Sequence, residues 1–227
     1  MSSIPIFCDR ADAGQQLAAA IVAEMAKVRS DRVSAEPIVY ALPKGGLPVA
    51  VPIAEQLQCP LDIVVAKKIT TVLNPELAIG SLTTDGQIMW TPTHDGSFIY
   101  NNRRIRERDV HNAQVKAQAQ LDRLAKFCPN ISPKGRIAIL VDDGIATGMT
   151  MTVATKSIVQ KQPAQLWIAC PVAPPEIISS LKRWSDRVII LETPHPFISV
   201  SRFYQHFPQV ELSEARTYLE KCNQRLS

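Results

Sequence analysis

Short apolar runs alternate along the chain with segments whose apolar residues recur at helical spacing. Leu17, Ile21 and Met25 are four residues apart and predict a helix over residues 12–27. Five apolar runs have the length and composition of buried strands, at residues 37–42, 61–66, 136–141, 166–171 and 188–192. Further helical patterns lie at residues 47–57, 104–127 and 175–184. This alternation predicts an α/β fold with an open, mainly parallel five-stranded sheet flanked by helices.

Two regions depart from the alternation. Residues 70–101 contain Asp85-Gly86 and Asp95-Gly96 between short strand-like pieces, which predicts hairpin turns and therefore a flap. Residues 193–227 hold several aromatic side chains and a short helical pattern, which predict a hood-like extension over the edge of the sheet. For a chain of 227 residues we expect one domain, residues 1–227, that carries both additions.

Composition narrows the class of protein. Lysine and arginine number 25 against 21 acidic residues, and this net charge of +4 argues against a nucleic-acid partner. The five cysteines are scattered and form no C-x-x-C pair, which argues against a zinc site and a disulfide framework. No secretory signal pattern opens the chain, and no apolar run reaches the roughly 18 residues needed to cross a membrane. We therefore expect a soluble, cytoplasmic protein without membrane contact.

The most informative motif follows the third predicted strand. Asp142 and Asp143 end the strand, and a loop with two glycines and two threonines then opens a helix. Glycine-rich loops at a helix N-terminus turn backbone N–H groups toward a phosphate. The carboxylates would repel that phosphate, so they suit neighbouring hydroxyls or a cation, as in a ribose 5-phosphate. The simpler alternative is a strand-to-helix turn in which one aspartate caps the helix.

A second loop points to another anion. Pro43, Lys44, Gly45 and Gly46 follow the first predicted strand, and Lys67-Lys68 follow the second. Because ligands bind beyond the carboxyl ends of strands in an open parallel sheet, we expect these loops to converge there. Lysines and exposed N–H groups would stabilise a leaving pyrophosphate. The alternative for the two lysines is a solvated strand end.

At this point the sequence resembles a known family. Four apolar residues, two acids and a T-G-x-T-type loop are similar to the phosphoribosyl-pyrophosphate motif of the type I phosphoribosyltransferases. The resemblance implies that Asp142 and Asp143 bind the ribose hydroxyls. It implies a pyrophosphate loop at Pro43–Gly46, a pyrophosphate-contacting Lys67 or Lys68, and a flap over the substrate. The residues placed around the 5-phosphate are Gly144, Ile145, Ala146, Thr147, Gly148, Met149 and Thr150.

The resemblance also carries expectations about partners and substrate. It implies Mg²⁺ held mainly by the substrate, with no direct protein ligand but with both aspartates nearby, and a homodimer, since dimers are common in the family. Ala146 stands where enzymes acting on hypoxanthine or guanine usually carry aspartate, which disfavours a 6-oxopurine acceptor. For the base we predict contacts from Val172, Phe197 and Tyr204. The aromatic residues could equally form the small core of the extension.

The sequence therefore predicts transfer of a phosphoribosyl group from phosphoribosyl pyrophosphate to a nitrogenous base, with release of pyrophosphate. Asp142, Asp143 and Lys67 are the predicted catalytic residues. One alternative is a regulatory protein that senses phosphoribosyl pyrophosphate without catalysis and that acts with or without binding nucleic acid. Another is a metal-dependent phosphohydrolase, which the lysines at the other strand ends disfavour. The basic run from Arg103 to Arg108 is interpreted as a solvated helix face rather than a phosphate clamp.

Overall fold

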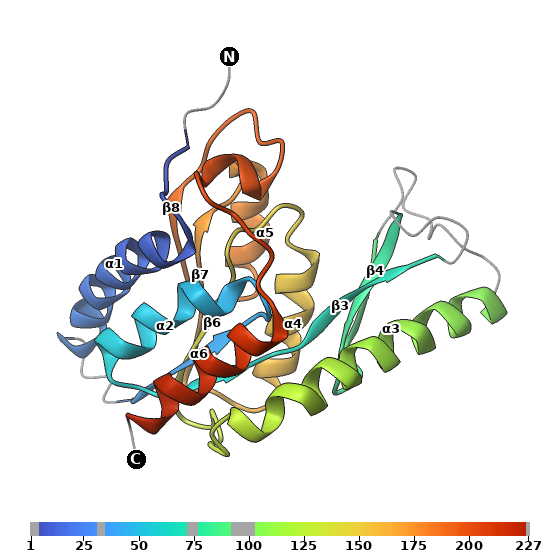
Figure 1. Cartoon of the computed structure of the whole chain (residues 1–227), viewed down its shortest axis with the longest axis horizontal. Coiled ribbons are helices and arrows are strands. Elements are labelled where there is room, and N and C mark those ends of the chain that lie inside the picture. Colours follow the sequence, from blue (N-terminus) through green and yellow to red (C-terminus); the bar gives the residue numbers. More distant parts are fainter. Residues whose placement is uncertain (1–4, 31–34, 72–76, 92–102, 226–227) are drawn as a thin grey trace.

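Five parallel strands form the central sheet in the computed structural model of the chain, which describes residues 5–30, 35–71, 77–91 and 103–225 (Figure 1). In spatial order the strands are β2 (Leu61–Ile63), β1 (Pro37–Ala41), β6 (Ile137–Val141), β7 (Gln165–Val172) and β8 (Arg187–Glu192). The register places Tyr40 of β1 beside Leu140 of β6 and Leu140 in turn beside Ile168 of β7. The predicted parallel α/β sheet is confirmed.

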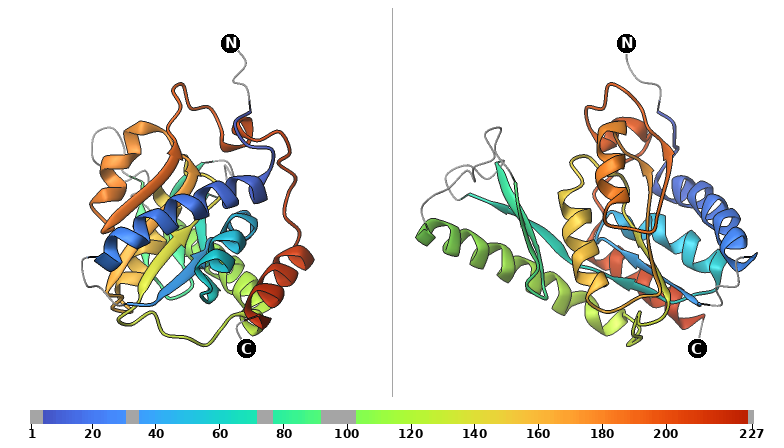
Figure 2. Two further views of the ribbon diagram at one scale, coloured as in Figure 1. Left: turned by 90° about the vertical axis from the view of Figure 1, so that its left-hand side faces the viewer. Right: turned by 180° about the vertical axis from the view of Figure 1, so that it is seen from behind.

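Helices cover both faces of this sheet (Figure 2). Alternate residues of β6 point to opposite sides, so Ile139 packs in the cluster with α1 (Arg10–Ser30) and α2 (Gly46–Leu57). Leu140 packs in the other cluster, with α4 (Met149–Val159), the short η2 (Pro175–Ile177) and α5 (Ile178–Lys182). Because both faces are buried, the central strands have no polar face, which is why they appear in the sequence as continuous apolar runs.

A second sheet and a long helix form an arm that projects from this layered body (Figures 1 and 2). Its antiparallel strands are β3 (Ala66–Thr70), β4 (Ala78–Thr83) and β5 (Ile88–Trp90). Helix α3 (Arg103–Leu124) packs along β3 and β4 and continues into η1 (Ala125–Phe127). The predicted turn at Asp85-Gly86 is confirmed, with Gly86 at φ +88°, whereas Asp95-Gly96 lies outside the described residues.

The arm begins earlier than the predicted flap. The second parallel strand ends at Ile63, and the chain enters β3 at Ala66, so Lys67 and Lys68 lie inside a strand of the second sheet. On β4, Leu82 is the partner of Lys67 and Ser81 is the partner of Lys68. The prediction that the two lysines follow a strand of the central sheet was therefore wrong. The apolar run that suggested one strand is divided between the two sheets.

The C-terminal segment passes the carboxyl ends of the central strands. It contains η3 (Val200–Phe203) and pairs with the N-terminal segment through a bridge between Phe7 and Tyr204. Helix α6 (Leu212–Gln224) then packs on α2 and on the edge strand β2, as expected for an extension over a sheet edge. No helix in the described parts of the chain is long and apolar enough to cross a membrane.

Candidate functional site

Two adjacent carboxylates lie at the carboxyl end of the central strand β6. The Asp143 N–H donates to Asp142 Oδ1 at 2.9 Å, and Tyr204 Oη donates to the Asp143 carbonyl oxygen at 2.6 Å. Arg10 Nε donates to Asp143 Oδ2 at 2.8 Å. Asp142 Oδ2 and Asp143 Oδ1 accept no hydrogen bond from any side chain that the structure describes. One oxygen of each carboxylate is therefore left for a ligand.

Burial dominates the electrostatics of this pair. It raises the pKa of Asp142 well above the usual aspartate range, and the adjacent charge of Asp143 raises it further. Burial also raises the pKa of Asp143, but the Arg10 guanidinium opposes this shift through its charge and its hydrogen bond. We infer that Asp143 holds the more stable negative charge, because Asp142 has no such counterion bonded to it. Neutral hydroxyl donors suit a pair in this state.

Residues 144–150 form a loop that opens α4. The Ile145 N–H donates to the Val172 carbonyl oxygen at 2.9 Å and anchors the loop to β7. Among the described residues, no acceptor is bonded to the N–H groups of Ala146, Thr147 or Gly148. Gly148 adopts a left-handed φ of +75° and caps the helix that begins at Met149. Free N–H groups beside a helix N-terminus are the kind of donors that can bind an anion.

Gly144 has no room for a side chain. A Cβ there would lie 2.5 Å from Cγ1 of Val200 and 3.1 Å from Cγ1 of Val172. The η3 turn is thus packed directly against the start of the loop formed by residues 144–150. The C-terminal extension thereby becomes part of the wall of the site.

The loop before α2 meets the carboxylates at van der Waals contact. A Cβ on Gly45 would lie 2.2 Å from Asp143 Oδ2, and one on Gly46 would lie 2.7 Å from the Val141 carbonyl oxygen. Gly45 has ordinary helical dihedrals, φ −62° and ψ −34°, so space rather than conformation requires glycine there. The peptide bond between Pro43 and Lys44 is cis. The two loops predicted to bind anions therefore adjoin each other across Asp143.

One expected donor in this loop is already used. The Gly46 N–H donates to the Leu42 carbonyl oxygen at 3.0 Å, as part of the turn that starts α2. Within the described chain, the N–H groups of Lys44 and Gly45 have no such backbone acceptor. The backbone donors that this loop offers a ligand are therefore the N–H groups of Lys44 and Gly45, which precede the helix.

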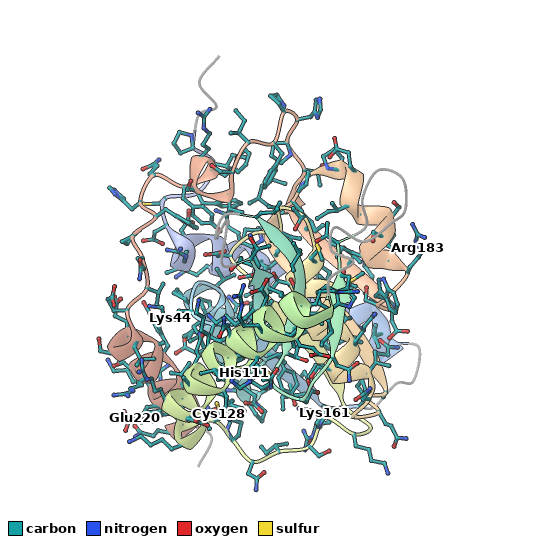
Figure 3. The ribbon with its side chains drawn as sticks, turned by 90° about the vertical axis from the view of Figure 1, so that its right-hand side faces the viewer. Lys44, His111, Cys128, Lys161, Arg183 and Glu220 are labelled. Carbon is teal, nitrogen blue, oxygen red and sulfur yellow. The ribbon has the colours of Figure 1, made fainter. Side chains whose placement is uncertain are left out.

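The charges of Lys44 and Lys116 act on Lys67, so the three lysines lie close together. Burial lowers the pKa of Lys67, and the charges of Lys44 and Lys116 lower it further. Lys67 is paired with Leu82, which packs in the core under α3, so its side chain lies on the α3 side of the hairpin sheet. Lys68 is exposed on the other side. Figure 3 views the molecule from the side on which the arm projects and labels Lys44.

The structure thus brings Lys44 and Lys67 together and separates Lys68 from them by strand alternation. Lys116, on α3, joins the pair although it had no motif to mark it. Only the packing of α3 on β3, which the sequence pattern does not reveal, places Lys116 beside Lys67. An anion that binds here would meet mutually repelling cations, which favours a multiply charged ligand.

The comparison with known proteins decides the family. The model of the phosphoribosyl transferase domain matches residues 12–201. The chain belongs to the phosphoribosyltransferase family. The diacid loop and the loop before α2 both lie within the matched range.

Relatives span the same region. A Mycobacterium tuberculosis protein named "Putative phosphoribosyl transferase" is 31% identical over 219 residues, which cover 96% of this chain and 47% of that protein. The chain thus spans about half the length of this curated relative. The crystal structure of TT1426 from Thermus thermophilus superposes with a TM-score of 0.75 at 30% identity, covering 95% of this chain and 98% of the other. The fold is therefore shared along nearly the whole chain.

The predicted base-contacting residues of this chain lie mostly in a small core. Val172 is fully buried, Tyr204 is 4% exposed, and both pack in one cluster with Phe7. Phe197 is half-buried, with its ring centroid 5.2 Å from that of Phe203. This packing corresponds to the alternative interpretation of the aromatic residues, in which they form a small core of the extension. Of the three, only Phe197 keeps surface that could face a ligand.

The two arginines of the basic run whose side chains the structure describes, Arg106 and Arg108, contact residues of the arm. The Arg106 guanidinium carbon lies 4.1 Å from the centroid of the Trp90 ring, and Arg108 Nε lies 3.6 Å from Asp109 Oδ1. The side chains of Arg103 and Arg104 lie outside the described part of the chain. The described arginines thus act within the arm, consistent with a helix face rather than a phosphate clamp.

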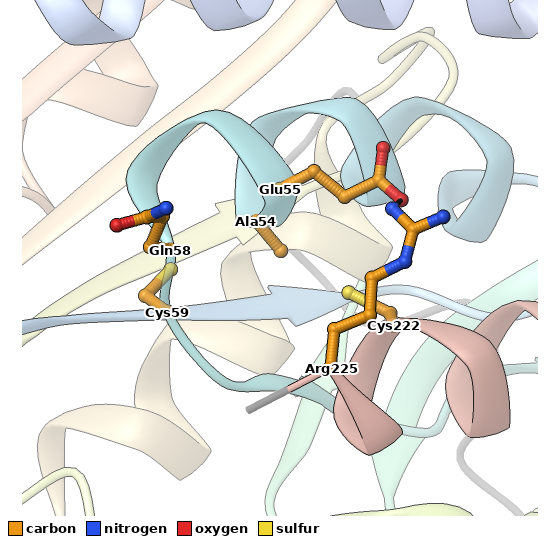
Figure 4. A pocket seen from close by; sticks show the side chains of 6 residues that line it. All are labelled: Ala54, Glu55, Gln58, Cys59, Cys222 and Arg225. Atoms are coloured by element: carbon orange, nitrogen blue, oxygen red, sulfur yellow. Dashed lines mark hydrogen bonds and ion pairs between the residues drawn. The ribbon is translucent and has the colours of Figure 1, made fainter. Parts of the chain in front are cut away.

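A large cavity elsewhere is not part of this site. It has a volume of about 510 Å³ and lies between the C-terminal ends of α2 and α6 (Figure 4). The diacid loop and the loop before α2 lie at the other end of α2, about 18 Å away along a helix of 12 residues. Burial raises the pKa of Cys59 to about 12 and that of Cys222 to about 11, so neither thiol there is a nucleophile at neutral pH.

Proposed function

We propose that this chain transfers the phosphoribosyl group of phosphoribosyl pyrophosphate to a nitrogenous base and releases pyrophosphate. The observation that carries the proposal is the contact between Gly45 and Asp143. It puts one anion-binding loop on each side of a carboxylate pair. A ligand with a 5-phosphate, a diol and a diphosphate carries its groups in that same order.

Ribose recognition falls to the free carboxylate oxygens. Asp142 Oδ2 and Asp143 Oδ1 accept the ribose 2- and 3-hydroxyls, which are neutral and therefore tolerated by buried acids. The 5-phosphate binds to the loop from Gly144 to Thr150, with the free N–H groups of Ala146, Thr147 and Gly148 as the main donors. Ile145 holds the loop in shape and contributes no N–H.

Departure of the diphosphate is the step that needs charge stabilisation. Positive charge develops at the anomeric carbon while the leaving pyrophosphate gains negative charge. Lys44 and Lys67, with the N–H groups of Lys44 and Gly45, stabilise that leaving group by fixed, preorganised charge. Binding of the anion also relieves the mutual repulsion of the lysines. Chain residues thus supply positioning and leaving-group stabilisation, without a covalent nucleophile.

Magnesium fits the donor set of this site. Carboxylate oxygens are the hard ligands that Mg²⁺ prefers, and it commonly binds through one or two of them plus substrate phosphates. Asp142 and Asp143 would lie beside such an ion, which the substrate would mainly hold, and no group of three or more acidic, histidine or cysteine side chains gathers as a metal cage in the described residues. When bound, the ion would neutralise diphosphate charge and so strengthen the leaving group.

Calorimetry with phosphoribosyl pyrophosphate and Mg²⁺ tests the binding site. The double variant Asp142→Asn, Asp143→Asn should bind at least about 100-fold more weakly than wild type, because two charge-assisted hydrogen bonds are lost. Asp122→Asn is the matched control, since Asp122 is an exposed carboxylate on α3. Equal affinity of the double variant and wild type would refute the ribose assignment.

A panel of nucleobases, assayed for pyrophosphate release, tests the reaction. Turnover with one base identifies the acceptor and supports transfer. Tight binding of phosphoribosyl pyrophosphate without turnover on any base would instead support the non-catalytic sensor. Ala146 gives a specific expectation within the panel, namely weak or no turnover of hypoxanthine and guanine.

A further inference from the structure

Arg10 lies where three distant segments of the chain meet. Its Nε donates to Asp143 Oδ2 at 2.8 Å, and its Nη1 donates to the Pro208 carbonyl oxygen at 2.7 Å. Its guanidinium carbon lies 3.6 Å from the centroid of the Phe207 ring. The residue is only 8% exposed. A buried cation held by a carboxylate, a carbonyl and a ring face has one well-defined position.

This position determines which oxygen of Asp143 meets a ligand. Oδ2 is bonded to Arg10 and lies against the backbone of Gly45, so it is enclosed on two sides. Oδ1 is the oxygen left over. Without the guanidinium, the carboxylate would lose the bond that sets its rotation and the counterion that favours its ionised form.

The same C-terminal segment holds this aspartate a second time. Tyr204 Oη donates to the Asp143 carbonyl oxygen, and the Tyr204 ring lies 4.8 Å from the Phe207 ring on which Arg10 stacks. Residues 204–208 therefore contact Asp143 in two ways: Pro208 and Phe207 hold Arg10 against the Asp143 side chain, and Tyr204 bonds to the Asp143 main chain. Neither contact is part of the diacid motif itself.

We propose that Arg10 is a positioning residue of the ribose site, which orients Asp143 for the ribose hydroxyl and couples that orientation to residues 204–208. The nature of the ligand in this inference rests on the proposed function. Arg10 does not touch the ligand and acts through Asp143.

A double-mutant cycle on the affinity for phosphoribosyl pyrophosphate with Mg²⁺ tests this. Arg10→Gln should weaken binding at least tenfold, and Asp143→Asn should weaken it too. If Arg10 acts through Asp143, adding Arg10→Gln to Asp143→Asn should change the affinity by less than threefold. Losses that multiply would overturn the inference, because Arg10 would then act independently of Asp143.

The matched control lies on the same helix. Glu24 of α1 pairs with Arg187 of β8, so Arg187→Gln also removes an ion pair that ties α1 to the sheet, away from the carboxylates. It should bind phosphoribosyl pyrophosphate within threefold of wild type. A loss equal to that of Arg10→Gln would overturn the inference in favour of general damage to α1.

A conservative variant covers the case in which Arg10→Gln does not fold. Arg10→Lys keeps the charge but not the planar fork that bonds Asp143 and Pro208 at once, so its affinity should fall below wild type and exceed that of any folded Arg10→Gln. Affinity equal to wild type would overturn the inference. If wild type itself does not bind the ligand, the proposed function and the inference fail together; if wild type and Arg10→Lys bind equally, the inference alone fails.

Discussion

Gly45→Ala is the sharpest perturbation of the contact on which the site is built. The new methyl group would lie 2.2 Å from Oδ2, 2.9 Å from Cγ and 3.4 Å from Oδ1 of Asp143, and these are its three nearest atoms. The backbone at Gly45 is in the ordinary helical region, so alanine meets no conformational penalty there. Any loss of stability must therefore come from the collision with one side chain.

The size of the effect follows from this geometry. The carboxylate must retreat by about 1 Å to reach ordinary contact, and that movement works against its bond to Arg10. Overpacking of this kind costs about 1–3 kcal/mol. In an Asp143→Ala background the three obstructing atoms are gone, so the same substitution should be neutral or stabilise by about 0.4–1 kcal/mol.

Urea denaturation of wild type, both single variants and the double variant measures this coupling. We expect a coupling energy of at least about 1 kcal/mol, with Gly45→Ala destabilising only while Asp143 is present. Gly80→Ala is the control: its Cβ would lie 2.6 Å from the Met89 carbonyl oxygen in the hairpin sheet, so its cost should be the same in both backgrounds. Additive costs for Gly45→Ala and Asp143→Ala would show that the two loops do not touch as described.

Three further variants probe charge and the arm. Asp142→Asn should raise the melting temperature of the free protein at pH 7, because folding raises the pKa of Asp142 and so disfavours its ionised form. This gain should vanish as the pH falls below about 3.9, the pKa of an unperturbed aspartate, and a gain that persists there would contradict the explanation. Lys67→Met should also stabilise the free protein at pH 7 while weakening pyrophosphate binding in calorimetry, because the folded-state pKa is lowered. That stability gain should shrink as the pH approaches about 10.4, and a pH-independent gain would indicate better packing instead. Ser157→Ala removes the 2.7 Å bond from Ser157 Oγ to Asp85 Oδ2 that ties the hairpin turn to α4. It should cost about 1.5–3 kcal/mol in urea denaturation with unchanged ligand affinity, and weakened binding would instead link the turn to the site.

Much of the site could be predicted because its parts are local. Asp142, Asp143 and the loop to Thr150 are consecutive, and the buried strand before them marks where they must emerge. The same holds for Lys44 and Gly45 after β1. Parallel strands bring their carboxyl ends to one edge, so two local motifs sufficed to predict one shared site.

The base-contacting residues could not be predicted in this way. An aromatic residue in a C-terminal segment can cover a ligand or fill a core, and its spacing is the same in both cases. Tyr204 is buried by the N-terminal Phe7, which lies near the opposite end of the chain. Only the docking of one chain end against the other decides which role the ring has.

By itself, the sequence determined the five-stranded parallel sheet and the positions of the two glycine-containing loops after β1 and β6, because burial on both faces and glycine-rich turns leave patterns within a few neighbouring residues. The tertiary structure alone decided that Lys67 lies in a second sheet and that Arg10 neutralises Asp143 across 133 positions. The reason is physical: a residue's own neighbours set its local conformation, whereas its counterion and its strand partner are set by how distant elements pack. The diacid motif could therefore be found in the chain, but the contacts that hold it could not.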